Sequence, residues 1–590
     1  MFHGAKSFQA FCSLLAQGAL LMSSIPLPNS AYGQASPPAG APPTPRSLSD
    51  ILEYISSGWD SLTRAMNRCE SLEDTKTGGE AVLYLPADMA VPATVGELQG
   101  HCRVRVEHLP AAITGPGQVN LSAIPAEGLL YLEHPYVVPG GQFNEMYGWD
   151  SYFIIRGLLR DHRTELAKGM VDNFFFEIEH YGGVLNANRT YYLTRSQPPF
   201  LTSMILAVYD SEAAEGKPDR VWLETAYQLA RRDYKQWSEQ PHLAGNTGLS
   251  RYFDHGDGPV PEIMGDPSHY YRGAAYFFLT HDRQFHSYLV HDNDKSLTGK
   301  QIGPRFRLFD CSPDPADIAA SECTPASSVG LSKDFYKGDR SMRESGFDVS
   351  FRFGPFGAAT HHFAPVCLNS LLYKTEKDLE RISTLLGRTE DAKGWSAKSE
   401  ERRKRVLQYF WDAREGLFFD YNIVSKSRSK YEYATTFYPL WAGLASKAQA
   451  EAVARNVNKF EQAGGLAMSR IESQAQWDYP YGWAPVQLLA IEGLRRYGYD
   501  READRLSDKF LLMVLENFRR DHTIREKYNV VTRSSETAVV EGYSQNVTGF
   551  GWTNGVFLEL LHESPGATAR LTAQRERTSD ADIANNVEKK

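Results

Sequence analysis

Asp348 has the surroundings of a carboxyl group that can exchange a proton. It lies in GDRSMRESGFDVSFRF, residues 338–353, after Arg340 and Arg343 and among small and aromatic side chains. Partial burial raises the pKa of a carboxyl group and a nearby guanidinium lowers it, so such a site can bring an acid close to neutral pH. The sequence therefore predicts Asp348 as a titrating acid. The alternative is a surface loop held by arginine–carboxylate pairs.

A second carboxylate, Glu526, lies in TIREKYNVV, residues 523–531. The stretch VVEGYSQNVTGFGWTNGVF, residues 539–557, adds Glu541 and several aromatic rings. Acid–base catalysis needs two groups whose surroundings push their pKa values apart. Glu526 is the candidate partner of Asp348, with a solvated charge beside Lys527 as the alternative interpretation.

Three stretches mix aromatic rings with polar side chains. They are PGGQFNEMYGWDSYF at 139–153, LNANRTYYLTRSQPPFL at 185–201 and QWDYPYGWAPVQ at 476–487. Tryptophan and tyrosine offer flat apolar faces to sugar C–H groups, while Asn, Gln, Asp and Arg satisfy hydroxyls. This mixture predicts a polyol ligand. Packing of the aromatic rings at helix ends is the alternative.

Amphipathic helical patterns dominate the elements that must position these residues. They are clearest at 220–240, 369–387 and 501–521, and strand-like alternation is sparse. Loops rich in Gly, Pro, Tyr and Trp recur between the helices from Gly140 to Gly555. Helical hairpins stacked around a centre would place such loops at one end. We therefore expect an all-α fold.

The chain of 590 residues has 42% hydrophobic residues and a net charge of −9, so it can bury a large core and gives no electrostatic reason to expect a nucleic-acid partner. We expect three parts after residue 47. They are a small irregular segment at 48–125, a catalytic domain at 126–565 and a disordered tail at 566–590.

The amino terminus reads as an export signal. Lys6 precedes an apolar run at 8–25, and small residues end it at Ala31 and Gly33. We expect a signal peptide over 1–33, a Pro-rich tether over 34–47 and a secreted or periplasmic protein that has no membrane segment after cleavage. A transmembrane anchor is the alternative.

Cysteine usage allows at most two intrachain disulfides in the exported form. Cleavage removes Cys12, and five cysteines remain: Cys69, Cys102, Cys311, Cys323 and Cys367. Cys311 and Cys323 enclose the short, turn-rich stretch CSPDPADIAASEC, which favours a bridge between them. Cys69–Cys102 is the second candidate. Helical spacing around Cys367 predicts a buried free thiol. No Cys/His cluster has zinc spacing, so no metal site is predicted.

Two signatures in the right order make the chain resemble the trehalases of glycoside hydrolase family 37. They are PGGQFNEMYGWDSY and QWDYPYGWAP, and the stretches at 185–201, 339–353, 364–378 and 525–531 resemble the fungal neutral branch. The family implies an (α/α)6 toroid and hydrolysis of α,α-trehalose with inversion. Asp348 then corresponds to the general acid and Glu526 to the general base. We expect a monomer that needs no cofactor and lacks the calcium-binding extension of the fungal enzymes.

The resemblance also carries over substrate-binding residues, among them Glu262 on a short match and Glu541 as a helper to the base. The full set is Phe143, Tyr147, Trp149, Asp150, Asn186, Arg189, Gln197, Glu262, Arg343, Trp477, Trp483 and Glu541. Gln142 departs from the family, whose signature has arginine there, so Gln142→Arg is expected to raise kcat/KM. A neighbouring arginine such as Arg340 filling that space is the alternative.

Two other functions stay open. One is hydrolysis of another small α-glucoside, which the departure at Gln142 would accommodate. The other is a non-catalytic sugar-binding protein on the same fold, since a fold permits functions that its site has lost. Retention of both Asp348 and Glu526 argues against the second.

Overall fold

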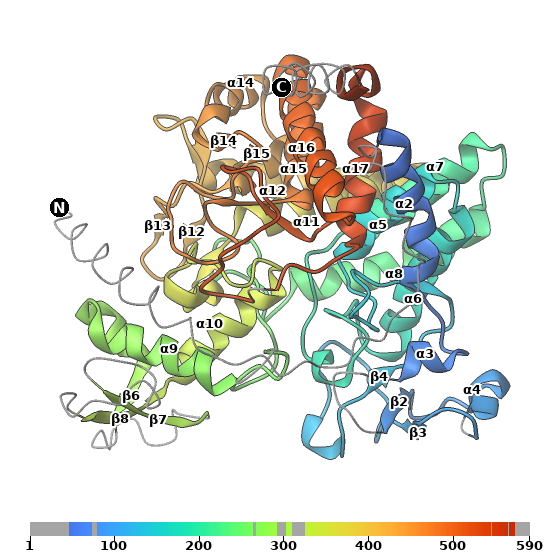
Figure 1. Ribbon diagram of the computed structural model, residues 1–590, viewed down its shortest axis with the longest axis horizontal. Coiled ribbons are helices and arrows are strands. Elements are labelled where there is room, and N and C mark those ends of the chain that lie inside the picture. Colours follow the sequence, from blue (N-terminus) through green and yellow to red (C-terminus); the bar gives the residue numbers. More distant parts are fainter. Residues whose placement is uncertain are drawn as a thin grey trace, which may run out of the picture. The chain divides into compact units, whose positions relative to one another are not determined.

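Stacked helical hairpins make up most of the chain (Figure 1). The computed structural model describes residues 47–73, 80–98, 100–263, 267–291, 303–309, 325–543, 545–564 and 566–572. Among these residues, none of the helices combines the length and apolar character that a membrane span requires. The expected signal peptide lies outside the described residues, as do nearly all of the tether and most of the tail.

Six inner helices close a ring within the described residues. In ring order they are α5 (Asp150–Arg160), α7 (Leu201–Ala214), α11 (Val366–Leu385), α13 (Tyr438–Trp441), α15 (Ala484–Arg496) and α17 (Gly551–Glu563). Each contacts the next, and α17 returns to α5. This arrangement confirms the predicted (α/α)6 toroid.

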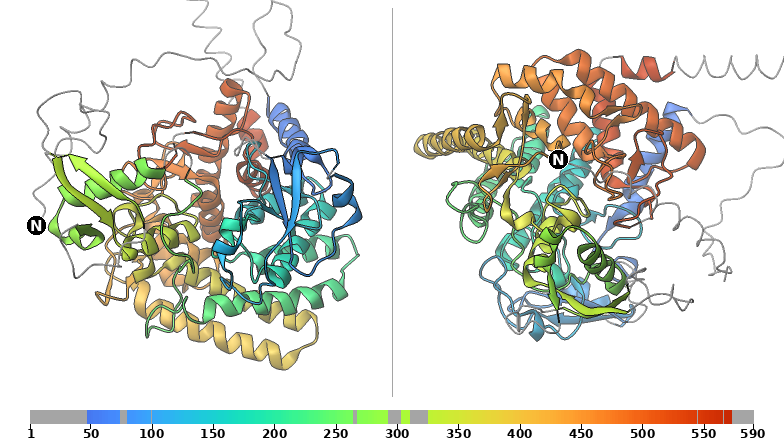
Figure 2. Two further views of the ribbon diagram at one scale, coloured as in Figure 1. Left: turned by 90° about the horizontal axis from the view of Figure 1, so that it is seen from below. Right: turned by 90° about the vertical axis from the view of Figure 1, so that its left-hand side faces the viewer.

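An outer layer of helices accompanies the ring. Its members are α6 (Thr164–His180), α8 (Arg220–Ser238), α12 (Thr389–Phe410), α14 (Lys447–Arg455), α16 (Asp500–Asp521) and α2 (Leu48–Leu62). The helix α2 packs on α17 and α16. The long helices α8 and α12 lie side by side (Figure 2, left), where the indole nitrogen of Trp395 donates to the hydroxyl of Tyr227 at 3.0 Å.

Two glycines allow the ring to close between α5 and α17. A Cβ on Gly157 would lie 2.5 Å from the Cα of Gly555, and a Cβ on Gly555 would lie 2.1 Å from the carbonyl oxygen of Phe153. Any side chain there would force the two helices apart. The sequence suggested Gly555 as a loop residue, but its role is close packing inside α17.

The segment at 48–125 contains regular structure where the sequence predicted none. After α2, the strand β2 (Ala81–Leu85) pairs in parallel with β3 (Val104–His108) and β4 (Leu129–Leu130), beside the short helices α3 (Cys69–Leu72) and α4 (Ala93–Leu98). All five residues of β2 are buried. Because a strand buried on both faces shows no alternation, its pattern is hard to recognise.

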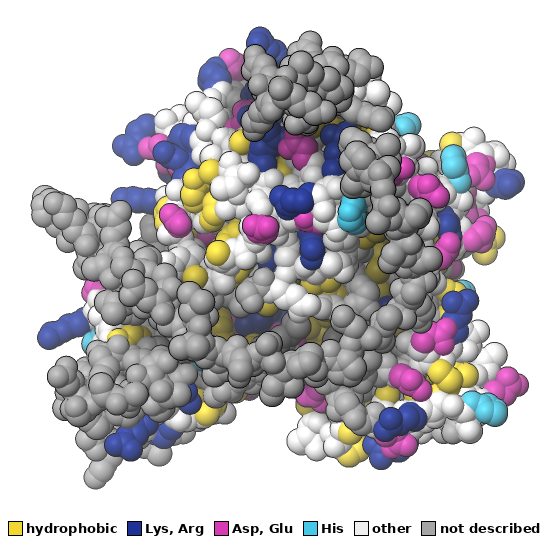
Figure 3. All heavy atoms as spheres, in the orientation of Figure 1, with side chains coloured by type: hydrophobic (Ala, Val, Ile, Leu, Met, Phe, Trp, Pro, Cys, Tyr) yellow, Lys and Arg dark blue, Asp and Glu magenta, His cyan; other side chains and the backbone are white. Residues whose placement is uncertain are grey.

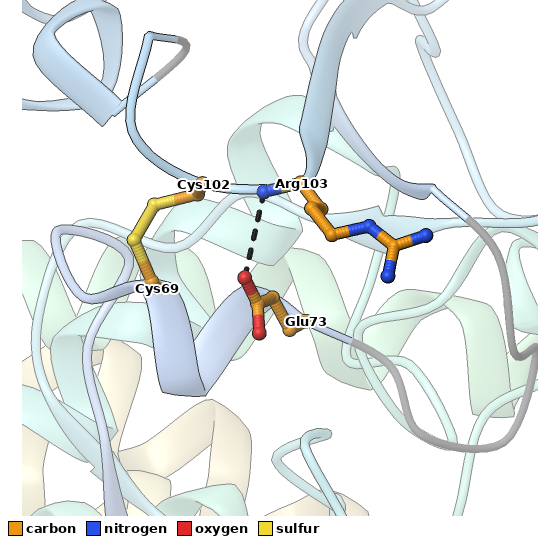
Figure 4. The surroundings of a disulfide bond; sticks show 4 residues. All are labelled: Cys69, Glu73, Cys102 and Arg103. Carbon is orange, nitrogen blue, oxygen red and sulfur yellow. Dashed lines mark hydrogen bonds between the residues drawn. A yellow bond between two sulfur atoms is a disulfide. The ribbon is translucent and has the colours of Figure 1, made fainter.

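A disulfide between Cys69 and Cys102 joins α3 to the turn before β3 (Figure 4). The two Cα atoms are 5.3 Å apart, within the usual range. Beside it, the Glu73 carboxylate accepts a hydrogen bond from the backbone N–H of Arg103 at 3.4 Å. The second predicted bridge is thus confirmed, as is the buried free thiol of Cys367. The favoured bridge, Cys311–Cys323, lies outside the described residues.

A second small sheet interrupts the helices between α8 and α10 (Lys333–Glu344). Its strands are β6 (Leu289–His291), β7 (Arg305–Phe309) and β8 (Pro325–Leu331), antiparallel in the order β6–β8–β7, with α9 (Pro267–Thr280) against them (Figure 1). A separate hydrophobic cluster that includes Phe278, Leu308 and Phe335 holds this unit together. The helix α10 follows this unit directly in the chain, and the loop that contains Asp348 begins at the end of α10.

Candidate active site

Aromatic rings from both signatures meet in one cluster. The ring centre of Trp149 lies 5.8 Å from that of Trp477 and 5.7 Å from that of Trp552. The ring centre of Phe347 lies 5.1 Å from that of Trp477. Trp483 stacks on Trp477 with ring centres 3.9 Å apart and planes 6° apart. Trp149, Trp477 and Trp483 are all buried, with at most 2% of each residue exposed.

Asp348 follows α10 and is next to this cluster through Phe347. Its Oδ2 lies 3.5 Å from the Nη1 of Arg343, and its side chain keeps 32% of its exposure. Burial raises the pKa of Asp348 to about 6, although the Arg343 guanidinium opposes the shift. The carboxyl group is thus both solvent-accessible and able to hold a proton near neutral pH.

Two buried arginines and their acidic partners surround the Asp348 loop. Arg195 bonds to Glu262, which also lies 3.9 Å from Arg343. Asp254 holds Arg195 at 3.8 Å and Arg340 at 2.9 Å. Glu262, which the sequence suggested on a short match, therefore lies beside the arginine that contacts Asp348. Arg340 is instead paired with Asp254.

The sequence analysis missed Arg195, although it lies in the stretch that carries Asn186, Arg189 and Gln197. Its side chain is 2% exposed, and its Nε and Nη1 have no hydrogen-bond partner within the described part of the chain. A buried guanidinium with unused donors suits hydroxyl groups of a ligand. The signal for Arg195 was a second arginine in one polar, aromatic loop.

Glu526 lies directly before β17 (Lys527–Asn529), which pairs with β16 (Tyr481–Trp483). Its side chain is 2% exposed; the Tyr543 hydroxyl donates to Oε1, and the Lys527 Nζ lies 4.0 Å from Oε2. Burial raises the pKa of Glu526, while Lys527 and Tyr543 oppose the rise. The interpretation of Glu526 as a solvated charge is therefore wrong.

Asp150, the first residue of α5, shares its surroundings with both carboxyl groups. It is 4% exposed, and its pKa is raised well above the ordinary value by burial, then by the charge of Glu526 and also by that of Asp348. Glu541 lies on the adjoining loop, where its backbone carbonyl accepts from the N–H of Gln476 at 3.0 Å and burial raises its pKa to about 7. The fold thus gathers the carboxyl groups of Asp150, Asp348 and Glu526 from distant stretches.

The loop at 185–197 holds the first signature in place. Gln197 Oε1 accepts from the Trp149 backbone N–H at 2.9 Å, and the Asn186 carbonyl accepts from Gly148 at 3.1 Å. Arg189 donates to Glu145 at 2.6 Å with both side chains buried. These hydrogen bonds fix the backbone of the first signature and the side chain of Glu145. In the same signature, the rings of Phe143 and Tyr147 lie 5.5 Å apart.

Gln142 lines a cavity of about 720 Å³ whose wall also contains Asp521, Arg525 and Asn546. Neither Asp348 nor Glu526 belongs to that wall. Arg525 shares this cavity, and Arg64 donates to the backbone carbonyl of the adjacent Gly141 at 3.2 Å, whereas Arg340 donates to Asp254 and to the carbonyl of Gly258. Over the face in Figure 3, basic and acidic side chains of the described residues are interspersed.

Asp334, His361 and His362 are the described residues whose ligand atoms could converge on a metal, within 4.8 Å of one another. Both Nε2 atoms face Asp334 Oδ1, at 2.9 and 3.3 Å. A metal on His361 Nε2 would leave a buried, unpaired N–H at Nδ1, which has no partner here. We therefore treat the cluster as a hydrogen-bonded brace at the start of α10.

The fold and the site together indicate the class of protein. A helical toroid that holds carboxyl groups beside an aromatic cluster is typical of a glycosidase. The sequence matches the family described as Trehalase over residues 97–277 and 328–565. The cytosolic neutral trehalase of Saccharomyces cerevisiae is 36% identical over 559 residues, covering 85% of this chain and 69% of that one. A probable trehalase of Eremothecium gossypii is 35% identical over 556 residues, covering 85% and 70%.

A solved structure agrees with these matches. Neutral trehalase Nth1 from Saccharomyces cerevisiae superposes with a TM-score of 0.71 at 36% identity, covering 89% of this chain and 96% of that one. The chain therefore belongs to the trehalase family, the family of α,α-trehalase glycosidases. The resemblance to the neutral branch is confirmed by the same relatives.

These relatives also correct the prediction of export. The proteins of Saccharomyces cerevisiae, Emericella nidulans and Neurospora crassa are each named as cytosolic. The prediction of a secreted or periplasmic protein is thereby contradicted, and the signal peptide finds no support. It rested on the composition of residues 1–33, and an apolar run with small residues at its end does not by itself specify export.

Proposed function

We propose that the protein hydrolyses α,α-trehalose with inversion, with Asp348 as general acid and Glu526 as general base. The observation that carries the proposal is the contrast between these two carboxyl groups within one site. Asp348 is partly open to solvent beside a shared arginine, whereas Glu526 is buried between a lysine and a tyrosine hydroxyl. Such contrasting surroundings support different proton affinities.

In this mechanism, protonated Asp348 gives its proton to the oxygen that joins the two glucose units. Glu526 takes a proton from a water molecule that attacks the anomeric carbon from the opposite face. An inverting enzyme keeps its carboxyl groups about 6.5–9.5 Å apart so that the water fits between them. In this proposal, Arg195, Arg343 and Asp150 bind sugar hydroxyls beside the two carboxyl groups.

The site calls for no cofactor in this proposal, and we take the protein to be a monomer. The twelve substrate-binding assignments also remain proposals. Multi-angle light scattering of the purified protein tests the monomer directly. A mass near twice 66.2 kDa would contradict it.

The deciding experiment measures glucose released from trehalose, maltose and isomaltose, while proton NMR follows the anomer formed first. Inversion at one anomeric centre predicts β-glucose alongside α-glucose from trehalose. Release of α-glucose alone would mean retention and would remove the base role of Glu526. Faster hydrolysis of another glucoside would replace trehalose as the substrate, and binding without hydrolysis would leave a sugar-binding protein.

A further inference from the structure

A buried lysine lies beside the proposed base, and the mechanism above does not use it. The side chain of Lys527 has no exposed surface. Its Nζ donates to Gln476 Oε1 and to the Tyr543 carbonyl, both at 2.8 Å, and lies 4.0 Å from Glu526 Oε2. The Nζ also lies 3.8 Å from the centre of the Tyr543 ring. The ammonium is thus enclosed by protein and cannot reach a substrate.

Gln476 continues the connection from the lysine to the proposed acid. It is fully buried, and its Nε2 donates to the backbone carbonyl of Asp348 while its Oε1 accepts from Lys527. Its own backbone is fixed as well, because its carbonyl accepts from the Trp483 indole at 2.9 Å. One side-chain amide therefore ties the Asp348 loop to the strand that begins beside Glu526.

We propose that Lys527 and Gln476 are positioning residues for hydrolysis: Lys527 keeps Glu526 ionised, and Gln476 fixes the strand of the base relative to the loop of the acid. This inference rests on the proposed roles of Asp348 and Glu526. Neither residue touches the reacting atoms, so both act through the two carboxyl groups.

The charges around Glu526 explain why it needs a cation. The titratable groups that face it in the described structure are Asp150 from α5, Asp348 from the loop after α10, Tyr543 and Lys527. Two of them are carboxyl groups, which oppose a further negative charge. Burial lowers the pKa of Lys527 to about 8, although Glu526 opposes the shift, and this value leaves the ammonium charged at pH 7.

The test compares Lys527→Met, which removes the charge, with Gln476→Met, which keeps the charge and removes the tie. An opposite charge within about 4–6 Å changes a carboxyl pKa by roughly 1–3 units. Since the base must be ionised, Lys527→Met should move the acid limb of the kcat/KM–pH profile to higher pH by about one unit or more. Activity should partly return as the pH rises, with KM within about threefold of wild type.

Gln476→Met should lower kcat about tenfold or more while the acid limb stays in place, since poor positioning of a catalytic group alone can cost that much. Lys337→Met is the matched control, because Lys337 is a partly buried lysine that donates to the carbonyls of Asp254 and Gly256 at 2.8 and 2.6 Å. It should leave the acid limb unchanged.

The charge role is refuted if the acid limb of a folded Lys527→Met variant coincides with that of wild type. If that variant does not fold, Lys527→Arg and Gln476→Met decide. An acid limb in Lys527→Arg that coincides with that of wild type supports the charge role, and a shifted limb in that variant refutes it. An unchanged kcat in Gln476→Met refutes the positioning role of Gln476. Glu526→Gln separates the two proposals. Full activity in Glu526→Gln refutes the base itself, whereas an inactive Glu526→Gln with an unmoved limb in Lys527→Met refutes only the inference.

Discussion

Replacing Asp348 with asparagine should abolish most of the activity and stabilise the protein at alkaline pH. Loss of general acid catalysis lowers turnover by about 10²–10⁴. The gain in stability has a separate cause, because burial holds the pKa of Asp348 at about 6 against an ordinary value of 3.8. An ionised Asp348 therefore opposes folding, and asparagine carries no such charge.

The magnitude follows from the pKa difference. Roughly two units at 1.36 kcal/mol each give about 3 kcal/mol as an upper bound. Because the Asp348 side chain is 32% exposed, solvent screening reduces this to about 1–2 kcal/mol. A folded pKa above the unfolded one means that stability is lost as the pH rises from 3.8 to about 6. The full loss is present at pH 8 and only part of it at pH 5.

Urea unfolding of wild type and Asp348→Asn at pH 5 and pH 8 measures the effect. The free energy of unfolding of the variant, relative to wild type, should be higher at pH 8 than at pH 5 by about 0.5–1 kcal/mol. A difference that does not change with pH would refute the assignment of a raised pKa to Asp348.

Asp254→Asn is the control with the opposite sign. Burial opposes ionisation of Asp254 too, but the guanidinium groups of Arg340 and Arg195 hold its pKa below the ordinary value. A depressed carboxyl pKa contributes stability above the unfolded pKa, and that stability is lost as the pH falls. Asp254→Asn should therefore destabilise the protein more at pH 8 than at pH 3. Equal behaviour of the two variants would show that the pH effect is not specific to Asp348.

Three further predictions concern other parts of the chain. Glu526→Gln should lower kcat at least about a hundredfold in a trehalose assay while thermal unfolding changes little; near-normal turnover would remove its role. Gln142→Arg should raise kcat/KM for trehalose by several-fold to about thirtyfold, because a charged donor forms stronger hydrogen bonds with sugar hydroxyls than an amide does. An unchanged kcat/KM would show that residue 142 does not contact the substrate. Replacing Cys69 and Cys102 with serine should cost about 2–4 kcal/mol for a loop of 33 residues, seen as a lower urea midpoint; a wild-type midpoint would contradict it.

Much of the helical fold was predictable because helices leave a periodic record in the sequence. The patterns at 220–240, 369–387 and 501–521 match α8, α11 and α16 to within three residues at each end. The sheet of β6, β7 and β8 left no such record, because its strands are short and separated by long connections.

The site was predictable in its residue types and not in its pairings. Motifs indicated Asp348 and Glu526, but the contact of Arg195 with Glu262 spans 67 residues of sequence and that of Lys527 with Gln476 spans 51. Such contacts depend on how loops of different hairpins meet in the closed ring. For the same reason Lys527 was interpreted as a mark of solvent exposure, although it is fully buried.

The way in which the cations are shared explains how one site can hold an acid and a base. Arg343 serves three carboxyl groups, with Asp348 and Asp339 at 3.5 Å and Glu262 at 3.9 Å. Within the described residues, Lys527 has a single acidic neighbour inside 4.0 Å, Glu526. A divided positive charge stabilises each carboxylate less than an undivided one. The proposed acid therefore holds its proton to a higher pH than an ordinary aspartate, up to about pH 6, while the proposed base has a neighbouring cation that favours the ionised form.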